Sequence, residues 1–375
     1  MQVMNSAMNI PFVDLKSQYQ SIKPEIDAAI AAVLDETAFV GGPRVKAFED
    51  AFAQYCGVSH CVGVANGTDA LFIALKTLGI GPGDEVITVA NTFVATSEAI
   101  KMAGAQVVFV DINPTSYNID VDQIERKITA KTKAIIPVHL YGQPADMAPI
   151  NQLAKKHGLR VIGDAAQAHG ASYRGQPIAK LADFTCYSFY PGKNLGAYGD
   201  AGALVTDNGE WAAAARMFAN HGRTKKYDHD LEGVNSRLDG LQAAILSVKL
   251  RYLEDWTERR RRNAQLYTRA LAKAAVVTPA EIADVRAVYH LYIVRVPDGR
   301  REAVQEHLNK NGISTGIHYP IALPYLNAYR GLGHTHGDFP EALRVSSEIL
   351  SLPMFPELSE EQIDYVAAAL AKAGA

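Results

Sequence analysis

Seven short apolar segments punctuate the chain between about residues 58 and 206. Each is continuously hydrophobic rather than alternating, and Gly, Asp and Pro occur in their flanks. Such runs are typical of strands that helices cover on both faces. The expected strands are His60–Ala65, Glu85–Val89, Val107–Val110, Ala134–Val138, Val161–Asp164, Phe184–Ser188 and Ala203–Thr206.

The segments between these runs carry hydrophobic positions at helical spacing, as in Asp69–Leu78 and Thr96–Met102. Repeated strand–helix units predict an α/β fold with a mostly parallel, seven-stranded sheet and right-handed crossovers. The N-terminal segment Ile22–Leu34 is also expected to be a helix, and its pattern allows packing with either part of the protein.

The pattern changes after about residue 240. Leu241–Leu271 is one long helical pattern rich in Leu, Arg, Ala and Glu. Beyond it, Val288–Val296 and Ile313–His318 are expected to be strands, and Arg301–Asn311 and Val366–Lys372 to be helices. Strands and helices of this kind indicate a smaller α+β unit that the long helix joins to the sheet.

The length of the chain agrees with two domains, because 375 residues are long for one hydrophobic core. Residues 1–250 are predicted to form a large domain that includes the N-terminal helical segment. Residues 251–375 are predicted to form the small C-terminal α+β domain.

Composition and charge argue against several classes of function. The net charge is −3, and the one basic run, Arg259–Arg262, is typical of a solvated helix face, so neither nucleic acid nor a membrane is an expected partner. Three cysteines (Cys56, Cys61 and Cys186) without a CxxC pair favour neither a disulfide framework nor a metal site. No apolar stretch is long enough to span a membrane, and Met1–Met8 lacks the order of a secretory signal, so a cytoplasmic location is expected.

Lys193 is the first candidate for chemistry, within the Gly-rich sequence Ser188–Gly196 directly after a predicted strand. A lysine at the edge of a core loses its proton more readily, because burial disfavours the charged form. A neutral amine is the form that makes an imine with an aldehyde. Taken alone the signal is weak, since most lysines in such loops are solvated.

Asp164 ends the predicted strand Val161–Asp164, at the carboxyl edge where open parallel sheets bind ligands. A buried carboxylate needs a partner, and a protonated pyridine nitrogen is one that keeps the ring able to accept electrons. The alternative for this residue alone is a helix N-cap.

The third candidate is Asn66–Leu71, between a predicted strand and a predicted helix. Gly67 allows close approach to backbone N–H groups at a helix start, which bind anions, and Thr68 and Ser188 could add hydroxyls. An anion anchor, an acid and a lysine, each directly after a strand, together suggest a pyridoxal-phosphate (PLP) site.

These residues resemble those of fold-type I PLP-transferases, whose fold is like that of aspartate aminotransferase. More closely, the chain resembles the DegT/DnrJ/EryC1/StrS sugar aminotransferases, from Pro11–Leu15 to the final helix. Besides the segments above, the motifs that carry the resemblance are Ala90–Thr96, Pro137–Gln143, Asp164–Gly170 and Asn235–Asp239.

The resemblance implies a role for each matching residue. Lys193 would bind PLP and transfer the proton, and Asp164 would pair with the pyridinium nitrogen. Gln167 would bond the phenolic oxygen of the ring, and Phe93 would stack on it. The implied phosphate ligands are Gly67, Thr68, Asp69 and Ser188. Asn235 would reach the phosphate from the neighbouring subunit of a homodimer with shared active sites. The expected substrate contacts are Tyr190, Arg237, His318 and Tyr319.

The implied reaction moves an amino group from L-glutamate to a nucleotide-linked keto-deoxysugar. Pro137–Gln143 and Asp164–Gly170 are most similar to enzymes that aminate C3 of a dTDP-3-keto-6-deoxyhexose. Amination at C4 of a dTDP-, UDP- or GDP-4-keto-6-deoxyhexose is the alternative. One departure bears on the sugar: Ile321–Pro324 comes after His318–Pro320 without the second histidine of the family's pattern.

Two further hypotheses remain. A PLP sugar dehydratase of this fold has histidine in place of Lys193, and a non-catalytic regulator would have no need of the intact constellation. Among the histidines, His139 is expected to be a strand-end residue, whereas His169 and His318 are open between lining a site and a structural role.

Overall fold

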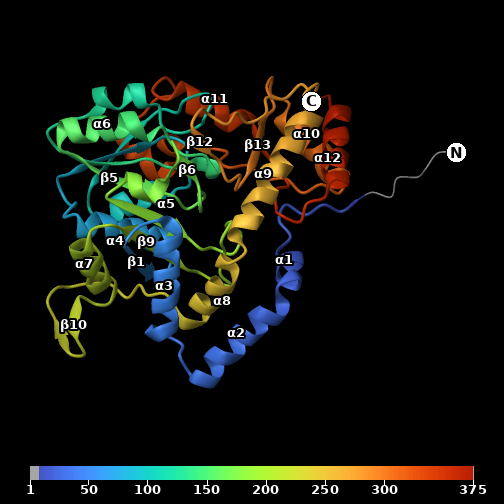
Figure 1. Cartoon of the computed structure of the whole chain (residues 1–375). Helices are drawn as coiled ribbons and strands as arrows, with labels where there is room; N and C mark the ends of the chain where they lie inside the picture. The colour runs from blue at the N-terminus through green and yellow to red at the C-terminus, as the bar shows by residue number, and fades with distance from the viewer. Residues whose placement is uncertain (1–7, 375) are drawn as a thin grey trace.

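The structure is a computed structural model that describes residues 8–374, and it is built around one seven-stranded sheet (Figure 1). The strand order is β1-β9-β8-β5-β4-β2-β3, and only β9 runs antiparallel to its neighbours. The strands are β1 (His60–Val64), β2 (Glu85–Val89), β3 (Gln106–Val110), β4 (Thr132–Ile136), β5 (Arg160–Asp164), β8 (Phe184–Ser188) and β9 (Gly202–Thr206). All seven predicted strands and the mostly parallel sheet are therefore confirmed.

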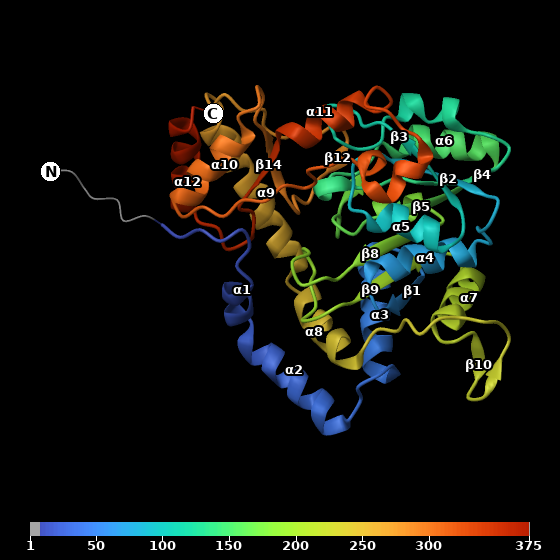
Figure 2. The ribbon, with the colours of Figure 1, turned by 180° about the vertical axis from the view of Figure 1, so that it is seen from behind.

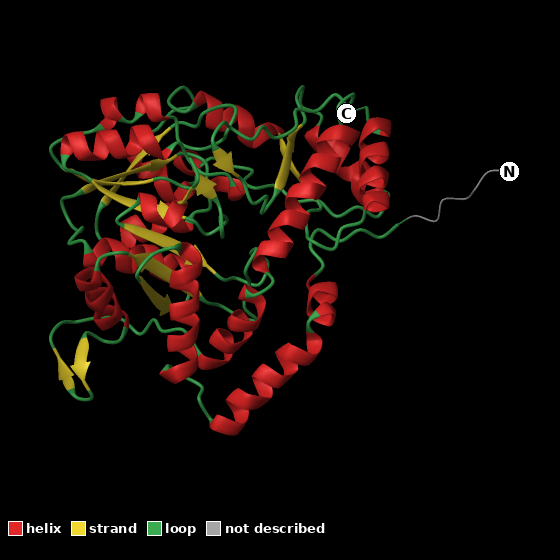
Figure 3. Ribbon diagram, in the orientation of Figure 1, coloured by secondary structure: helices red, strands yellow, loops and turns green. Residues whose placement is uncertain are grey.

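Helices lie on both sides of this sheet (Figure 3), which explains why its strands are almost wholly buried. Their apolar faces enclose the largest core of the molecule. The covering helices are α3 (Gly42–Cys56), α4 (Gly67–Thr77), α5 (Ala95–Met102), α6 (Met147–His157) and α7 (Gly209–Ala219).

The long helix expected over Leu241–Leu271 is in fact two helices, α8 (Gly240–Leu250) and α9 (Leu253–Ala270). No Gly or Pro marks the break. The side chains of Arg251 and Tyr252 at the break both bond Glu25 of the N-terminal helix α2 (Lys23–Glu36). A contact between segments far apart in sequence therefore accompanies the break, and periodicity alone does not register such contacts.

The N-terminal helices α1 (Leu15–Ser21) and α2 form an arm beside α8 and α9, as both views of the ribbon show (Figures 1 and 2). Ile22 and Ile26 pack there against Ile245, Val248 and Trp256. The expected N-terminal helix is confirmed, and its partners are the connecting helices.

A second hydrophobic core lies in the C-terminal part, where β13 (Tyr292–Arg295) pairs with β14 (Ile349–Leu352). The strand expected at Val288–Val296 is confirmed in shortened form. The strand expected at Ile313–His318 is wrong: that segment makes only single bridges, from Ile313 to Ile10 and from Gly316 to Ser351. The segment bridges a different part of the chain at each of these two positions, so no continuous ladder of β-sheet hydrogen bonds forms.

The remaining elements complete the C-terminal part and the edges. They are α10 (Arg301–Lys310), α11 (Pro340–Glu348), α12 (Glu360–Lys372), a small sheet of β12 (Val285–Arg286), β6 (Ser172–Tyr173) and β7 (Gln176–Pro177), and the hairpin of β10 (Arg223–Lys225) and β11 (Asp228–His229). The sheet core also includes residues beyond 250, such as Val288 and Phe339. The domain boundary at 250 stays a prediction.

Within residues 8–374, no helix is long and apolar enough to cross a membrane. The three cysteines are buried and unbonded. The interpretation of Met1–Met8 falls almost wholly outside the described residues, and the cytoplasmic location stays a prediction.

Candidate active site

A cavity of about 650 Å³ opens at the carboxyl ends of the parallel strands. That volume is in the range of sites for cofactors and small molecules, and the position is where open α/β sheets bind their ligands. Ten of the residues expected at the site line it: Gly67, Thr68, Phe93, Asp164, Gln167, Ser188, Tyr190, Lys193, His318 and Tyr319.

Asp164 is a buried carboxylate at the end of β5, bonded only by neutral donors among the described residues. Thr96 Oγ1 donates to Oδ2 at 2.8 Å, and the Ala166 N–H donates to Oδ1 at 3.1 Å. Burial raises the pKa of Asp164 above its ordinary value, although these two bonds act in the opposite direction. A cationic group bound in the cavity beside Asp164 would lower the free-energy cost of burying this carboxylate.

Lys193 lines the same cavity and is otherwise enclosed by protein. Burial lowers the pKa of its ammonium to about 8, against the attraction of Asp164. Near neutral pH a useful fraction of Lys193 is therefore the neutral amine, the form that reacts with a carbonyl carbon.

The helix α4 begins at the cavity with Gly67, packed directly on Ser188. A Cβ built on Gly67 would lie 2.7 Å from Cβ of Ser188, so only glycine fits without a shift. The first N–H groups of a helix have no partner within it and favour an anion. Gly67, Thr68 and the Ser188 hydroxyl are thus suited to an anionic group.

Asp69, by contrast, does not line the cavity. Its N–H donates to Asn66 Oδ1 at 2.8 Å, and its carboxylate accepts from Ser236 Oγ at 2.7 Å and from Asn66 Nδ2 at 3.1 Å. The geometry gives Asp69 the task of fixing the N-cap of α4 and offers no direct contact with an anion.

Phe93 and Gln167 both contact Tyr319. Phe93 is 54% exposed, and its ring centre lies 5.7 Å from that of Tyr319. Gln167 Nε2 donates to Tyr319 Oη at 3.2 Å, and Gln167 Oε1 accepts from the N–H of Tyr141 at 2.7 Å. An exposed aromatic face and an oriented amide are available for a flat ring.

Asn235 and Arg237 do not line the cavity of their own chain. Asn235 is exposed, and the guanidinium of Arg237 lies beside the side-chain amide of Asn220. Both precede α8. If they take part in the site, it is in that of another copy.

The histidines divide by position. His318 lines the cavity, stacks on Phe12, and its Nδ1 lies 2.7 Å from Ser351 Oγ. His139 and His169 are buried outside the cavity lining, and burial lowers the pKa of each to about 3. Nδ1 of His139 accepts from the N–H of Ala145, which is a structural role.

Five further residues line the cavity and were not among the expected site residues. They are Phe12, Val13, His290, Leu291 and Met354, from the N-terminal and C-terminal parts of the chain. The sequence gives only one signal for His290, an isolated histidine within the predicted strand Val288–Val296.

The tautomer of His290 follows from its contacts with Asn194. Nδ2 of Asn194 donates to the Val288 carbonyl at 3.0 Å, so Oδ1 faces His290 Nδ1 at 3.2 Å as an acceptor. Nδ1 of His290 therefore carries the proton, and Nε2 is left as an acceptor.

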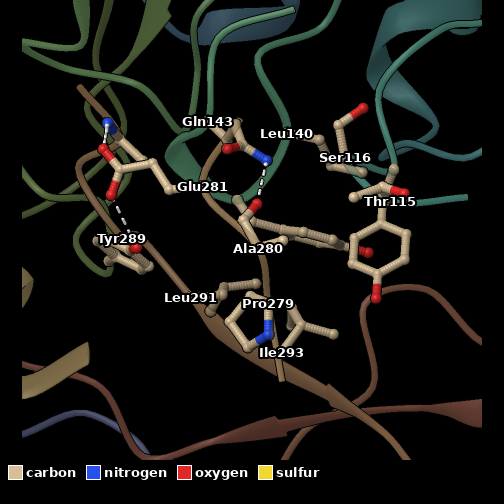
Figure 4. A pocket seen from close by; sticks show the side chains of 13 residues that line it. Thr115, Ser116, Leu140, Gln143, Pro279, Ala280, Glu281, Tyr289, Leu291 and Ile293 are labelled. Atoms are coloured by element: carbon tan, nitrogen blue, oxygen red, sulfur yellow. Dashed lines mark hydrogen bonds between the residues drawn. The ribbon is translucent and has the colours of Figure 1, made fainter. Parts of the chain in front are cut away.

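A second hollow lies between residues 115–117 and 279–293 (Figure 4). Its volume of about 30 Å³ holds little more than a water molecule. Gln143 Nε2 donates to the Ala280 carbonyl at 3.2 Å, and Tyr289 Oη donates to Glu281 Oε2 at 3.0 Å. These bonds hold the segments that line the hollow together, and the hollow between them is too small for a cofactor or a sugar.

A family model described as the DegT/DnrJ/EryC1/StrS aminotransferase family matches residues 20–371. The chain belongs to this family. A pleiotropic regulatory protein of Geobacillus stearothermophilus is 49% identical, over 97% of this chain and 98% of its own. The dTDP-3-amino-3,4,6-trideoxy-alpha-D-glucose transaminase of Streptomyces venezuelae is 44% identical, over 94% and 93%. The crystal structure of Streptomyces venezuelae DesV is 43% identical with a TM-score of 0.95, covering 97% and 98%.

Membership of the DegT/DnrJ/EryC1/StrS family makes this protein a PLP-dependent aminotransferase of nucleotide-linked sugars. The fold-type I architecture expected from the sequence is confirmed by the match to DesV.

The cavity fits the cofactor of the DegT/DnrJ/EryC1/StrS family at three separate points. Asp164 offers a buried carboxylate for a pyridinium nitrogen, the start of α4 offers N–H groups for a phosphate, and Lys193 offers an amine for an aldehyde. When bound, PLP supplies an electron sink that stabilises negative charge at the carbon being deprotonated.

Proposed function

We propose that this enzyme moves the amino group of L-glutamate to C3 of a dTDP-linked 3-keto-6-deoxyhexose. The coarse activity, amino transfer to a nucleotide-linked sugar, follows from the family. The finer assignment is supported by the similarity to a dTDP-3-amino sugar transaminase over nearly the whole chain. The observation that carries the chemistry is the joint placement of Lys193, Asp164 and the start of α4 around one cavity.

Lys193 has two tasks in this proposal. Its neutral amine would hold the cofactor, and its Nζ, once free, would accept the proton from Cα of the amino donor. The same Nζ then returns the proton as a general acid, a double role that a pKa of about 8 suits because both forms are populated near neutral pH.

Asp164 would keep the ring nitrogen protonated, and its bonds to Thr96 and Ala166 hold the carboxylate in place. Phe93 would lie against the ring, and Gln167, oriented by the Tyr141 N–H, would bond the phenolic oxygen. Gly67, Thr68 and Ser188 would bind the phosphate, and Asp69 fixes the N-cap of α4.

The sugar and the donor would lie towards Tyr190, His318 and Tyr319, on the open side of Lys193. The segment after His318 departs from the family's pattern, because Ile321–Pro324 contains no second histidine. Ile321 is half exposed there. This side of the cavity decides which keto sugar is accepted.

The charge balance of the cavity favours a homodimer with shared active sites. Lys193 is the one Lys or Arg among its lining residues in the described chain, beside the carboxylates of Asp164 and Asp200. Glutamate, the cofactor phosphate and a nucleotide diphosphate all bring negative charge, and uncompensated buried charge is costly. Asn235 and Arg237, which lie outside their own cavity, would supply contacts to the partner's site.

Mixing two inactive variants tests the shared site. Lys193→Ala and Arg237→Ala, unfolded and refolded together in equal amounts, should form heterodimers in which one of the two sites carries neither change. Random pairing makes about half of the dimers mixed, so about a quarter of the wild-type activity should return. Activity that stays at the level of the separate variants would contradict shared sites.

The substrate assignment is tested by single turnover. The enzyme loaded with pyridoxamine phosphate is mixed with dTDP-, UDP- and GDP-linked 3-keto and 4-keto sugars, and amino sugar is measured by mass spectrometry. We expect product from the dTDP-3-keto sugar. Product from 4-keto sugars alone would establish the C4 alternative, and product from none, with no cofactor retained on purification, would favour a regulator.

A further inference from the structure

Lys249 is a buried lysine that the proposed reaction does not use. It lies on α8 with only 1% of its surface exposed, and no carboxylate in the described chain forms a salt bridge with it. Its Nζ donates to the carbonyl of Gly196 at 2.5 Å and lies 5.0 Å from the ring centre of Tyr198 and 6.0 Å from that of Trp256. Burial lowers the pKa of Lys249 to about 8, so the fold maintains a costly group here.

The carbonyl that Lys249 bonds belongs to the loop that carries Lys193. The N–H of Ala197 donates to the Phe189 carbonyl at 2.7 Å, which closes the loop. Inside it, the Lys193 N–H donates to the Tyr190 carbonyl at 2.8 Å. A Cβ on Gly196 would lie 2.2 Å from the Pro191 carbonyl oxygen, so the two sides of the loop are in close contact.

The same face of α8 holds the loop at a second point. Gln242, two helical turns before Lys249, accepts from the Tyr198 N–H at 2.8 Å and donates to the Tyr198 carbonyl at 3.4 Å. Figure 2 shows the loop between β8 and β9 extending to α8. One helix face therefore binds the backbone of residues 196–198 just after Lys193.

We propose that Lys249 is a positioning residue, whose ammonium bonds the Gly196 carbonyl and so fixes the loop that presents Lys193 to Asp164. The inference rests on the proposed role of Lys193. An apolar side chain of similar volume would fill this space at lower cost, because replacing a buried charge by a hydrophobic group is often neutral or stabilising. The buried ammonium of Lys249 therefore has an explanation if it maintains the geometry of the loop instead of the stability of the fold.

The test compares holoenzymes carrying Lys249→Met and Val248→Ala. Met preserves most of the volume and removes the bond to Gly196. Val248 is a buried neighbour on α8 that packs with Ile22 and Ile26 of the N-terminal arm, so its truncation should cost about 1–3 kcal/mol of stability on the side of α8 away from the loop. Three quantities are measured in each: amide hydrogen exchange of residues 193–198, the fraction of cofactor fixed to Lys193 by borohydride, and the kinetic constants.

In Lys249→Met we expect exchange in residues 193–198 to be faster by about tenfold, the equivalent of about 1.4 kcal/mol of local opening, with the central strands unchanged. Borohydride fixation should fall, and kcat should drop by about tenfold with KM for L-glutamate altered much less. Val248→Ala should lower the melting temperature and leave all three quantities near wild type.

Unchanged loop exchange and kcat in Lys249→Met, or the same changes in Val248→Ala, would overturn the inference. If Lys249→Met fails to fold, Gln242→Leu removes only the contacts with Tyr198 and should show the same pattern more weakly. Failure of borohydride to fix cofactor in the wild type would instead reject the role of Lys193, so the two failures are distinguishable.

Discussion

Removal of the Lys193 amine should make the cofactor-free enzyme more stable. The pKa of Lys193 falls from an ordinary 10.5 to about 8 in the folded protein. At about 1.4 kcal/mol per pH unit, this corresponds to about 3 kcal/mol at pH values below 8. Because Lys193 is partly exposed to the cavity, we expect Lys193→Met to gain about 1–3 kcal/mol at pH 7.

The pH dependence gives the sign of the effect. Since the folded pKa lies below the unfolded one, the wild type bears the cost in full below pH 8 and loses it as the pH rises from 8 to 10.5. The advantage of Lys193→Met should therefore shrink across the same interval. Urea unfolding of the cofactor-free proteins at pH 7, 8.5 and 10 measures it.

Lys101→Met on α5 is the control, because Lys101 is exposed and its replacement should change little at any of these pH values. A Lys193→Met protein no more stable than wild type at pH 7 would mean that Lys193 is solvated in the fold. An advantage that did not change with pH would assign the gain to apolar packing instead of to the charge.

Two further substitutions test the anion site and the acid. Gly67→Ala should cost about 1–3 kcal/mol of folding stability through its clash with Ser188, and it should weaken cofactor binding about tenfold by displacing the start of α4. Gly331→Ala, with open space around it, is the control. Calorimetry measures the stability and fluorescence titration the cofactor affinity, and equal losses in the two variants would contradict the argument. Asp164→Asn should all but abolish turnover yet stabilise the cofactor-free protein at pH 7, because the raised pKa means that the wild type loses stability as the pH climbs above 3.8. Melting curves at pH 4 and 7 check this, and a gain already complete at pH 4 would reject it.

The strands were predictable because each is buried on both faces and needs a continuous apolar run, a signal that depends on local sequence alone. Ile313–His318 lacks such a run, because Ser, Thr and Gly separate Ile313 from Ile317, and it pairs only at single positions, with Ile10 and Ser351. Whether a segment with this weaker pattern becomes a strand depends on the segments that lie beside it. The break between α8 and α9 depends in the same way on Glu25 of a distant helix.

The cofactor end of the site was predictable for a related reason. Asp164, Ser188 and Gly67 each lie at or directly after the end of a strand, and the carboxyl ends of parallel strands share one edge, so order along the chain translates into proximity. Asp69 shows the limit of this reasoning: it is in the right segment, but its N–H and carboxylate bond Asn66 and Ser236. A motif predicts which segment lies near the ligand, while the hydrogen bonds within the protein decide which of its atoms can contact it.

The substrate end is built differently, and this explains why the chemistry can be read more readily than the sugar. Its wall combines Phe12, His290, His318 and Met354, which no short motif joins and which meet only through the packing of both ends of the chain. Phe12 stacks on His318, and its carbonyl accepts from the Met354 N–H. Phe12, His318 and Met354, which we propose to face the sugar, thus come from other segments than α8, whose Lys249 and Gln242 bind the loop of Lys193. Substitutions in those segments can therefore change the substrate while the amino-transfer chemistry is kept.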